Sequence, residues 1–235
     1  MNKLILGDCL EILSKGTSQS IDLILCDLPY STTNCSWDSL IPLDQLWAQY
    51  KRIIKPKRPI VLFAAQPFTS QLIMSNLPWY KYSWIWKKNI STGFLNAKHQ
   101  PLRITEDICV FAEGKTTYNP QMRKGETHIR GGKSKKVGGE IYNDFSNRTE
   151  TISDEYYPNN ILEFDSVNKP QHPTQKSLEL CEYLIKTYSN EGDLVLDNTM
   201  GSGTTCLAAK RLNRRYIGIE NDPNYFEIAK QRLND

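Results

Sequence analysis

The stretch Asp197-Asn-Thr-Met-Gly-Ser-Gly-Thr-Thr205 follows the short apolar run 194–196 and leads into a segment with helical character. A strand, a tight turn and the start of a helix, in that order, form the repeating unit of parallel α/β sheets. Glycines at positions 201 and 203 let the backbone approach a ligand closely, and the helix start offers free N–H donors. The stretch therefore predicts an α/β fold with a ligand-binding turn at the end of a strand.

An acidic residue strengthens this signal, because Glu220 stands 19 residues after Gly201, at the end of the next predicted strand. That spacing is typical of a carboxylate that hydrogen-bonds a ribose diol. A phosphate-binding P-loop would need a lysine that the stretch lacks, and a nicotinamide fingerprint would need a third glycine where Cys206 stands. An ordinary βα turn with an acidic strand end is the alternative interpretation.

Apolar runs alternate with amphipathic segments along most of the chain. Strands are predicted over 21–26, 60–65, 82–86, 108–112, 194–196 and 216–219, and helices over 43–54, 178–188, 204–212 and 223–233. Regular structure is also expected to resume at 160–164. Ser177 stands where a helix N-cap is expected. The alternation predicts a mainly parallel sheet covered by helices on both faces. Residues 1–114 and 159–235 would then form one body, interrupted by the region 115–158.

The inserted region is basic and lacks periodicity. Residues 115–148 hold eight lysines and arginines against three acidic residues, whereas the whole chain has a net charge of only +3. A compact basic segment suits a phosphate backbone, and a solvated loop is the alternative interpretation. We therefore predict a recognition lobe over 115–158. Its candidate nucleic-acid contacts are Arg123, Lys124, Arg130, Lys133, Lys135 and Lys136.

The cysteine pattern, the first residues and the uncharged segment of the chain indicate in which compartment the protein is expected. The six cysteines form no CxxC pair, which predicts reduced thiols, a cytoplasmic protein and no zinc site. Asp8 and Glu11 interrupt the opening apolar residues, so no secretory signal is predicted. The uncharged segment 59–80 is a poor membrane span, because it contains internal prolines, amides and hydroxyls.

Three further motifs precede the glycine turn, and one follows it. They are Gly7-Asp8-Cys-Leu-Glu11, Asp27-Leu-Pro-Tyr30, His172-Pro-Thr-Gln-Lys176-Ser and Tyr216-Ile-Gly-Ile-Glu220. In this order the sequence resembles the β group of DNA amino-methyltransferases, and in particular small phage-type adenine-specific enzymes. The resemblance spans nearly the whole chain except 115–158. It implies a Rossmann-like S-adenosylmethionine-dependent methyltransferase fold with circularly permuted motif order and a small inserted target-recognition lobe.

The resemblance assigns roles to the parts of the chain. Residues 1–114 and 159–235 become the catalytic and cofactor-binding domain, and 115–158 the target-recognition region. S-adenosylmethionine is the implied cofactor, with Asp8 near its adenine and Thr174 and Lys176 near its methionine end. The implied cofactor contacts are Asp8, Thr174, Lys176, Asp197, Gly201, Ser202, Gly203, Thr204, Thr205 and Glu220. A turn aspartate at position 8 and a solvated lysine at position 176 are the alternatives.

The motif Asp27, Leu28, Pro29 and Tyr30 carries the implied chemistry. An exocyclic amino nitrogen is a poor nucleophile because its lone pair is delocalised into the ring. The Asp27 carboxylate and the Leu28 carbonyl can accept its N–H bonds and free that lone pair for attack on the sulfonium methyl group, while Tyr30 stacks on a base flipped from the duplex. The sulfonium is already activated, so no metal is expected.

The sequence departs from the family pattern at several positions. Leu28 replaces the first proline of D-P-P-Y, and Ser177 replaces the last proline of H-P-T-Q-K-P. Asn198 and Thr199 replace Pro-Phe in the glycine loop, so an apolar contact to the cofactor is expected to be missing. None of these changes removes a group with a direct chemical role.

The leading hypothesis is transfer to adenine N6 in duplex DNA, because aspartate at the first motif position is typical of adenine enzymes. Cytosine N4 is the alternative target, and a catalytically inactive nucleic-acid-binding subunit is the alternative of another class. Cytosine C5 chemistry is excluded, because none of the six cysteines follows a proline. A homodimer is compatible with so small a lobe. A companion restriction endonuclease cannot be inferred from this chain.

Overall fold

The computed structural model describes residues 2–30, 40–132, 148–168 and 170–234. The chain divides into two compact units. The larger unit comprises Met1–Asn119 and Asn160–Asp235, and the smaller comprises Pro120–Asn159. Within the described residues, the larger unit contains the central sheet and its helices, and the smaller contains a pair of antiparallel strands.

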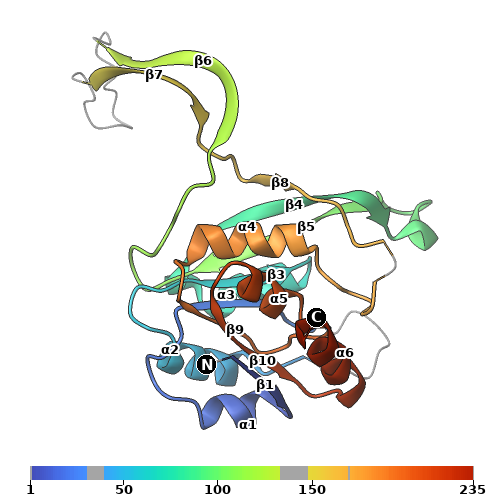
Figure 1. Cartoon of the computed structure of the whole chain (residues 1–235). Helices are drawn as coiled ribbons and strands as arrows, with labels where there is room; N and C mark the ends of the chain where they lie inside the picture. The colour runs from blue at the N-terminus through green and yellow to red at the C-terminus, as the bar shows by residue number, and fades with distance from the viewer. Residues whose placement is uncertain (1, 31–39, 133–147, 169, 235) are drawn as a thin grey trace. The chain divides into compact units, whose positions relative to one another are not determined.

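The larger unit is built around a sheet whose described strands follow the order β1-β10-β9-β2-β3-β5-β4-β8 (Figure 1). Their bounds are β1 Lys3–Leu6, β10 Arg215–Glu220, β9 Leu194–Asp197, β2 Leu23–Asp27, β3 Ile60–Ala64, β5 Arg103–Phe111, β4 Tyr80–Thr92 and β8 Ile161–Glu163. Strand β5 is antiparallel to both of its neighbours, and the other pairings are parallel. The predicted mainly parallel α/β sheet is therefore confirmed.

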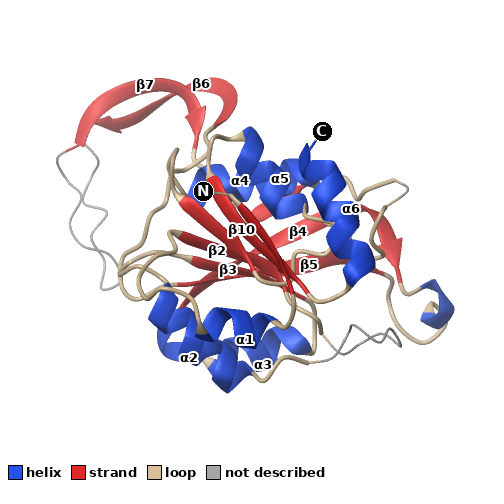
Figure 2. Ribbon diagram, turned by 60° about the horizontal axis from the view of Figure 1, so that its bottom comes forward, coloured by secondary structure: helices blue, strands red, loops and turns tan. Residues whose placement is uncertain are grey.

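Helices cover both faces of this sheet, as Figure 2 shows. One face carries α1 (Cys9–Ser14), α2 (Leu43–Ile53) and α3 (Phe68–Ser75), and the other carries α4 (Leu178–Tyr188), α5 (Thr204–Arg211) and α6 (Pro223–Asn234). Two separate clusters of buried apolar side chains fill the two sheet–helix interfaces. Burial on both faces explains why β3 is apolar at each of its positions.

Most elements lie where periodicity predicts them. Helix α2 buries Leu46, Trp47, Tyr50 and Ile53, all on the predicted face. Ser177 occupies the N-cap position of α4, although no hydrogen bond from its side chain caps the helix. No described helix is long and apolar enough to cross a lipid bilayer.

The sequence did not predict several short or exposed elements. Strand β1 and helix α1 are short, and β4 extends well beyond the predicted 82–86. In the region without periodicity, β6 (Arg123–Gly132) pairs with β7 (Arg148–Tyr156). The described side chains of this pair are largely exposed. Neither strand therefore needs the alternation of apolar and polar residues by which a strand is predicted from sequence.

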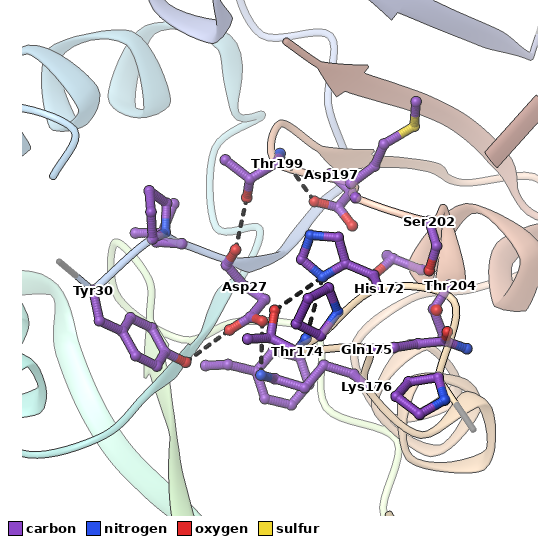
Figure 3. A pocket seen from close by; sticks show the side chains of 18 of the residues that line it. Asp27, Tyr30, His172, Thr174, Gln175, Lys176, Asp197, Thr199, Ser202 and Thr204 are labelled. Carbon is purple, nitrogen blue, oxygen red and sulfur yellow. Dashed lines mark hydrogen bonds and ion pairs between the residues drawn. The ribbon is translucent and has the colours of Figure 1, made fainter. Parts of the chain in front are cut away.

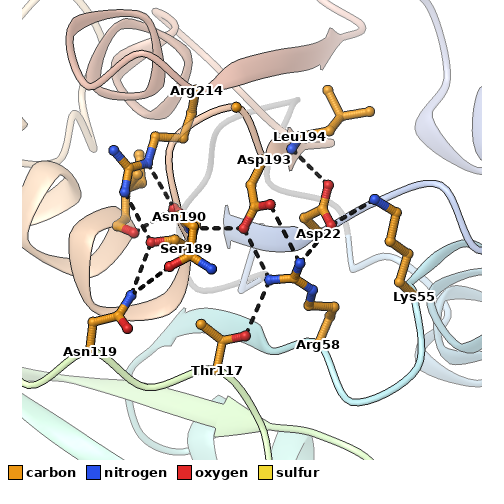
Figure 4. A network of polar contacts seen from close by, with 12 residues as sticks. Asp22, Lys55, Arg58, Thr117, Asn119, Ser189, Asn190, Asp193, Leu194 and Arg214 are labelled. Atoms are coloured by element: carbon orange, nitrogen blue, oxygen red, sulfur yellow. Dashed lines mark hydrogen bonds and ion pairs between the residues drawn. The ribbon is translucent and has the colours of Figure 1, made fainter.

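A polar network fixes the amino ends of the strands (Figure 4). The Asp22 carboxylate is almost completely buried and lies 2.7 Å from the Lys55 ammonium and 3.2 Å from the Arg58 guanidinium. It also accepts a hydrogen bond from the Leu194 amide at 3.0 Å, and Arg58 reaches on to Asp193. The network links β2 to β9 at the ends opposite the glycine loop.

Replacement of Asp22 by alanine is expected to lower the free energy of unfolding by about 1–3 kcal/mol, because a buried amide and two cations lose their acceptor. Glu227→Ala is the matched control, since its ion pair with Lys230 is exposed and should contribute less than about 0.5 kcal/mol. Urea unfolding monitored by tryptophan fluorescence measures both. Equal stability of the two variants would contradict a structural role for the network.

Candidate active site

The cleft of the larger unit lies where the chain order of the sheet reverses. Strands β2 and β9 are parallel neighbours. After β9 the chain continues through α5 to β10 on one side, and after β2 it continues through α2 to β3 on the other. The two helices cover opposite faces, so a crevice forms at the carboxyl ends of the strands. A cleft of about 730 Å³ is found there, within the size range of small-molecule sites.

This cleft brings together nearly all residues that the sequence selected for catalysis and cofactor binding. Its lining includes Asp8, Asp27, Leu28, Pro29, Tyr30, Thr174, Lys176, Asp197, Gly201, Ser202, Thr204, Thr205 and Glu220. Gly203 is the exception, since it faces α6 instead. A Cβ atom there would lie 3.0 Å from that of Ala229, and its φ of +76° also favours glycine.

Two of the residues that depart from the family pattern, Asn198 and Thr199, connect the glycine loop to neighbouring elements by hydrogen bonds. The Thr199 hydroxyl donates to the backbone carbonyl of Asp27 at 2.9 Å. The side-chain oxygen of Asn198 accepts from the Cys26 thiol at 3.0 Å and from the Tyr50 hydroxyl. These hydrogen bonds hold the glycine loop against the end of β2 and against α2.

Both carboxylate oxygens of Asp27 are engaged by neighbouring side chains (Figure 3). The Tyr30 hydroxyl donates to Oδ1 at 2.7 Å, and the Lys176 ammonium lies 2.7 Å from Oδ2. Burial raises the pKa of Asp27, the Lys176 charge opposes that rise, and Glu106 adds to it. The family resemblance implies that Lys176 contacts the cofactor. In the structure its ammonium group lies against the carboxylate of Asp27, the candidate catalytic residue.

Sequence reasoning missed two members of this charged cluster. The Glu106 carboxylate lies 2.8 Å from the Lys88 ammonium and 3.3 Å from that of Lys176. Burial raises the pKa of Glu106, but the two lysines outweigh burial and leave that pKa lowered. Burial lowers the pKa of Lys176, but Asp27 and Glu106 outweigh it and leave the pKa raised. Glu106 stands beside Asp107 in the mixed polar first half of β5, so nothing in the local sequence singled it out.

The Tyr30 ring is held on one side. It stacks on Phe68 with ring centroids 5.1 Å apart and an interplanar angle of 25°. Phe68 itself is buried at the start of α3. Because the hydroxyl is also tied to Asp27, the ring is fixed both by stacking and by a hydrogen bond.

Glu220 organises the turns beside the cleft. Its carboxylate accepts the backbone amide of Gly201 at 2.8 Å, of Asn221 at 3.0 Å and of Asp222 at 2.9 Å. Gly201 has a φ of +50°, a conformation that favours glycine. Burial raises the pKa of Glu220, and these amides oppose the rise. The predicted ribose acceptor is thus also a structural acceptor for the glycine loop.

Asp8 and His172 border the same cleft. The Asp8 carboxylate caps α1 by accepting the Glu11 amide at 2.9 Å, which agrees with its interpretation as a turn aspartate. Burial, reinforced by the Lys176 charge, lowers the pKa of His172 to about 4. A histidine with such a pKa is neutral near pH 7. Its ring lies against Tyr225 and close to Gly201.

The basic candidates belong to the smaller unit. Arg123 and Lys124 lie exposed on β6, and Arg130 belongs to the same strand. Lys133, Lys135 and Lys136 lie outside the described residues. Their proposed contact with nucleic acid stays a prediction. The described residues contain no group of three or more potential metal ligands.

The chain belongs to the DNA methylase family, whose sequence profile matches residues 21–231. Among curated relatives, the Type II methyltransferase M.HpaI of Haemophilus parainfluenzae is 31% identical over 252 residues, which cover 99% of this chain and 74% of that protein. The Type II methyltransferase M1.MboII of Moraxella bovis is 28% identical, with coverage of 100% and 97%.

Solved structures agree with this assignment. The M1.HpyAVI–SAM complex is 27% identical, has a TM-score of 0.69, and the match covers 99% of this chain and 100% of that one. The PvuII DNA methyltransferase, described as cytosine-N4-specific, has a TM-score of 0.73 with 18% identity, covering 100% of this chain and 86% of that one. At that identity the likeness establishes the fold alone.

Substitutions of the charged cluster should move the pKa of Asp27 in opposite directions. Lys176→Met removes the cation that lowers this pKa, so the carboxylate should stay protonated to higher pH. Glu106→Gln removes a neighbouring negative charge, so the pKa should fall. Titration of the Asp27 carboxyl carbon by ¹³C NMR measures both. A shift in the same direction for both variants would contradict the cluster as described.

Proposed function

We propose that this protein transfers a methyl group from S-adenosylmethionine to the exocyclic N6 of an adenine flipped from duplex DNA. Membership of the DNA methylase family supports the general activity. The observation that carries the proposal is the position of Asp27. This residue lines the same cleft as the glycine loop, and its backbone carbonyl accepts a hydrogen bond from Thr199 of that loop. An amine acceptor and a nucleotide-type turn therefore face one cavity.

The residues of the cleft fit S-adenosylmethionine. Gly201 lacks a side chain at the turn, the N-terminus of α5 follows, and the carboxylates of Asp8 and Glu220 border the same space. The cofactor supplies a methyl group already activated by its sulfonium. Asp8, Thr174, Lys176, Asp197, Gly201, Ser202, Gly203, Thr204, Thr205 and Glu220 are the proposed cofactor residues, with Gly203 acting through packing on α6.

Asp27 and Leu28 act on the target amine. Each carboxylate oxygen has two lone-pair sites, so Asp27 retains acceptor capacity beside Tyr30 and Lys176. One amine hydrogen is donated to this carboxylate and the other to the Leu28 carbonyl, which localises the nitrogen lone pair for in-line attack. Pro29 restricts the loop backbone, and the free face of the Tyr30 ring stacks on the flipped base.

Adenine N6 is favoured by the aspartate that opens the motif, a tendency of the family that the sequence resembles. Cytosine N4 is the alternative target, because it too is an exocyclic amine beside a ring nitrogen. An inactive nucleic-acid-binding subunit is disfavoured, since Asp27, Pro29 and Tyr30 are all present. Duplex DNA, held in part by the smaller unit, is the proposed substrate. A cytoplasmic location and a homodimer stay predictions.

Incubation of the purified protein with unmethylated duplex DNA and methyl-labelled S-adenosylmethionine tests the proposal. Digestion and separation of the nucleosides should place the label on N6-methyladenine. Label on N4-methylcytosine would keep the mechanism and replace the target. Absence of labelled nucleosides, with cofactor binding retained, would support the inactive subunit.

The variant Asp27→Ala should abolish methyl transfer and leave cofactor affinity nearly unchanged. The carboxylate acts on the target amine, and Lys176 keeps Glu106 as its partner in the variant. Single-turnover transfer and isothermal titration with S-adenosylmethionine provide the two readouts. A large loss of cofactor affinity would mean that Asp27 belongs to the cofactor site.

The variant Glu220→Ala should weaken cofactor binding by about 1.5–3 kcal/mol, the scale of a hydrogen bond to a charged group. Loss of the carboxylate also frees the Gly201 amide, so thermal unfolding without cofactor serves as the control. Glu220→Gln keeps an oxygen acceptor and should bind with intermediate affinity. Unchanged affinity of the alanine variant would remove Glu220 from the site.

A further inference from the structure

A long hairpin extends the sheet beyond its carboxyl edge. Strand β4 runs in the direction of β3, because β5 lies antiparallel to both. Asp107 of β5 pairs with Ala64, where β3 ends, and on its other side with Ile85. Strand β4 continues to Thr92, which is about 20 Å further at strand geometry. We call residues 89–103 the arm; its tip is the short helical turn η2 (Phe94–Asn96), seen beyond β4 and β5 in Figure 1.

The tip of the arm is apolar and open to solvent. Leu95 is 84% exposed and Phe94 is 75% exposed, the highest values among the exposed large apolar side chains that the structure describes. Ile90 and Leu102 on the stem are also about half exposed. Large apolar side chains gathered on one projecting element are typical of a binding surface.

The ionisable side chains of the arm are basic. Residues 89–103 contain Lys98, His99 and Arg103 and no aspartate or glutamate. All three side chains are exposed. Within the described part of the chain, neither Lys98 nor Arg103 forms an ion pair. The arm therefore presents uncompensated positive charge next to its apolar tip.

The stem of the arm is continuous with the candidate active site. Ile90, Thr92, Gly93 and Arg103 line the same cleft as Asp27. A molecule bound along the arm would therefore reach the mouth of the cavity that holds the proposed catalytic carboxylate.

From these observations we infer that the arm is a DNA-docking element of the larger unit. Phe94 and Leu95 pack against the bases that border the vacated position of the flipped base, and Lys98 and Arg103 contact the flanking phosphates. The inference rests on the proposed function. Apolar side chains can insert between partly unstacked bases, and cationic side chains bind the phosphate backbone. Base flipping leaves a gap in the duplex beside the cleft, where such side chains can insert.

The alternative partner for the apolar tip of the arm is a second copy of the chain. The charge distribution favours DNA, because two copies meeting through this surface would bring like charges together. Continuity of the stem with the cleft favours DNA as well, since the substrate of Asp27 has to lie at that cleft.

Fluorescence anisotropy with a labelled 30-base-pair duplex over a range of NaCl concentrations tests the inference on the full chain. The double variant Phe94→Ala/Leu95→Ala should bind at least about fivefold more weakly, the lower bound for lost aromatic–base stacking. Lys98→Ala should reduce the slope of log affinity against log salt by about 0.9. The matched controls are Met74→Ala on α3 and Lys186→Ala on α4. Both side chains are exposed and neither lines the cleft, so both variants should bind as the wild type does.

The same variants separate failure of the arm from failure of the proposed function. If the wild type methylates DNA and the arm variants bind the duplex equally well, the arm inference is overturned and the function stands. If the wild type neither binds duplex DNA nor methylates it, the proposed function fails first. Sedimentation velocity adds a third readout: loss of self-association in the double variant would assign the tip to a second copy and overturn the inference.

Discussion

The side-by-side pairing of β2 with β9 is the constraint on which the site depends. The register pairs Leu23 with Val195 and Ile24 with Leu196, so residues far apart in the sequence end their strands together. Thr199 then ties the glycine loop to the Asp27 carbonyl at the carboxyl ends, and Asp22 ties the amino ends. Asp27 and the glycine loop are therefore brought together by the order of the strands in the sheet, which neither motif determines alone.

The buried charges beside Asp27 follow from the same position. A largely buried carboxylate is costly unless it is paired, and Lys176 provides the pair. That lysine is itself buried, so Glu106 compensates it and Lys88 compensates Glu106 in turn. The alternating signs keep Asp27 ionisable in a partly buried position. Replacing any one member changes the charge felt by the others.

The sequence predicts the parts of this arrangement that depend on local pattern. Apolar runs identify the central strands, and ordered motifs identify Asp27, the glycine loop and Glu220. The contact of Lys176 with Glu106 was not predictable, because Glu106 lies in a strand that comes close to Lys176 only after β5 pairs with β3. Strands β6 and β7 were missed for a different reason. Their described side chains are largely exposed, so no core imposes an apolar period on them.

Tyr30 shows that much of the site is ordered before a ligand enters. Phe68 supports one face of its ring, and the hydroxyl directs one oxygen of Asp27 while Lys176 directs the other. A carboxylate held from two sides does not need to reorient when an amine arrives, so less of the interaction energy is spent on ordering it. The free lone pairs of that carboxylate then set the only positions from which an amine hydrogen can approach. Selectivity for an exocyclic amine would thus come from a geometry fixed by three neighbouring side chains.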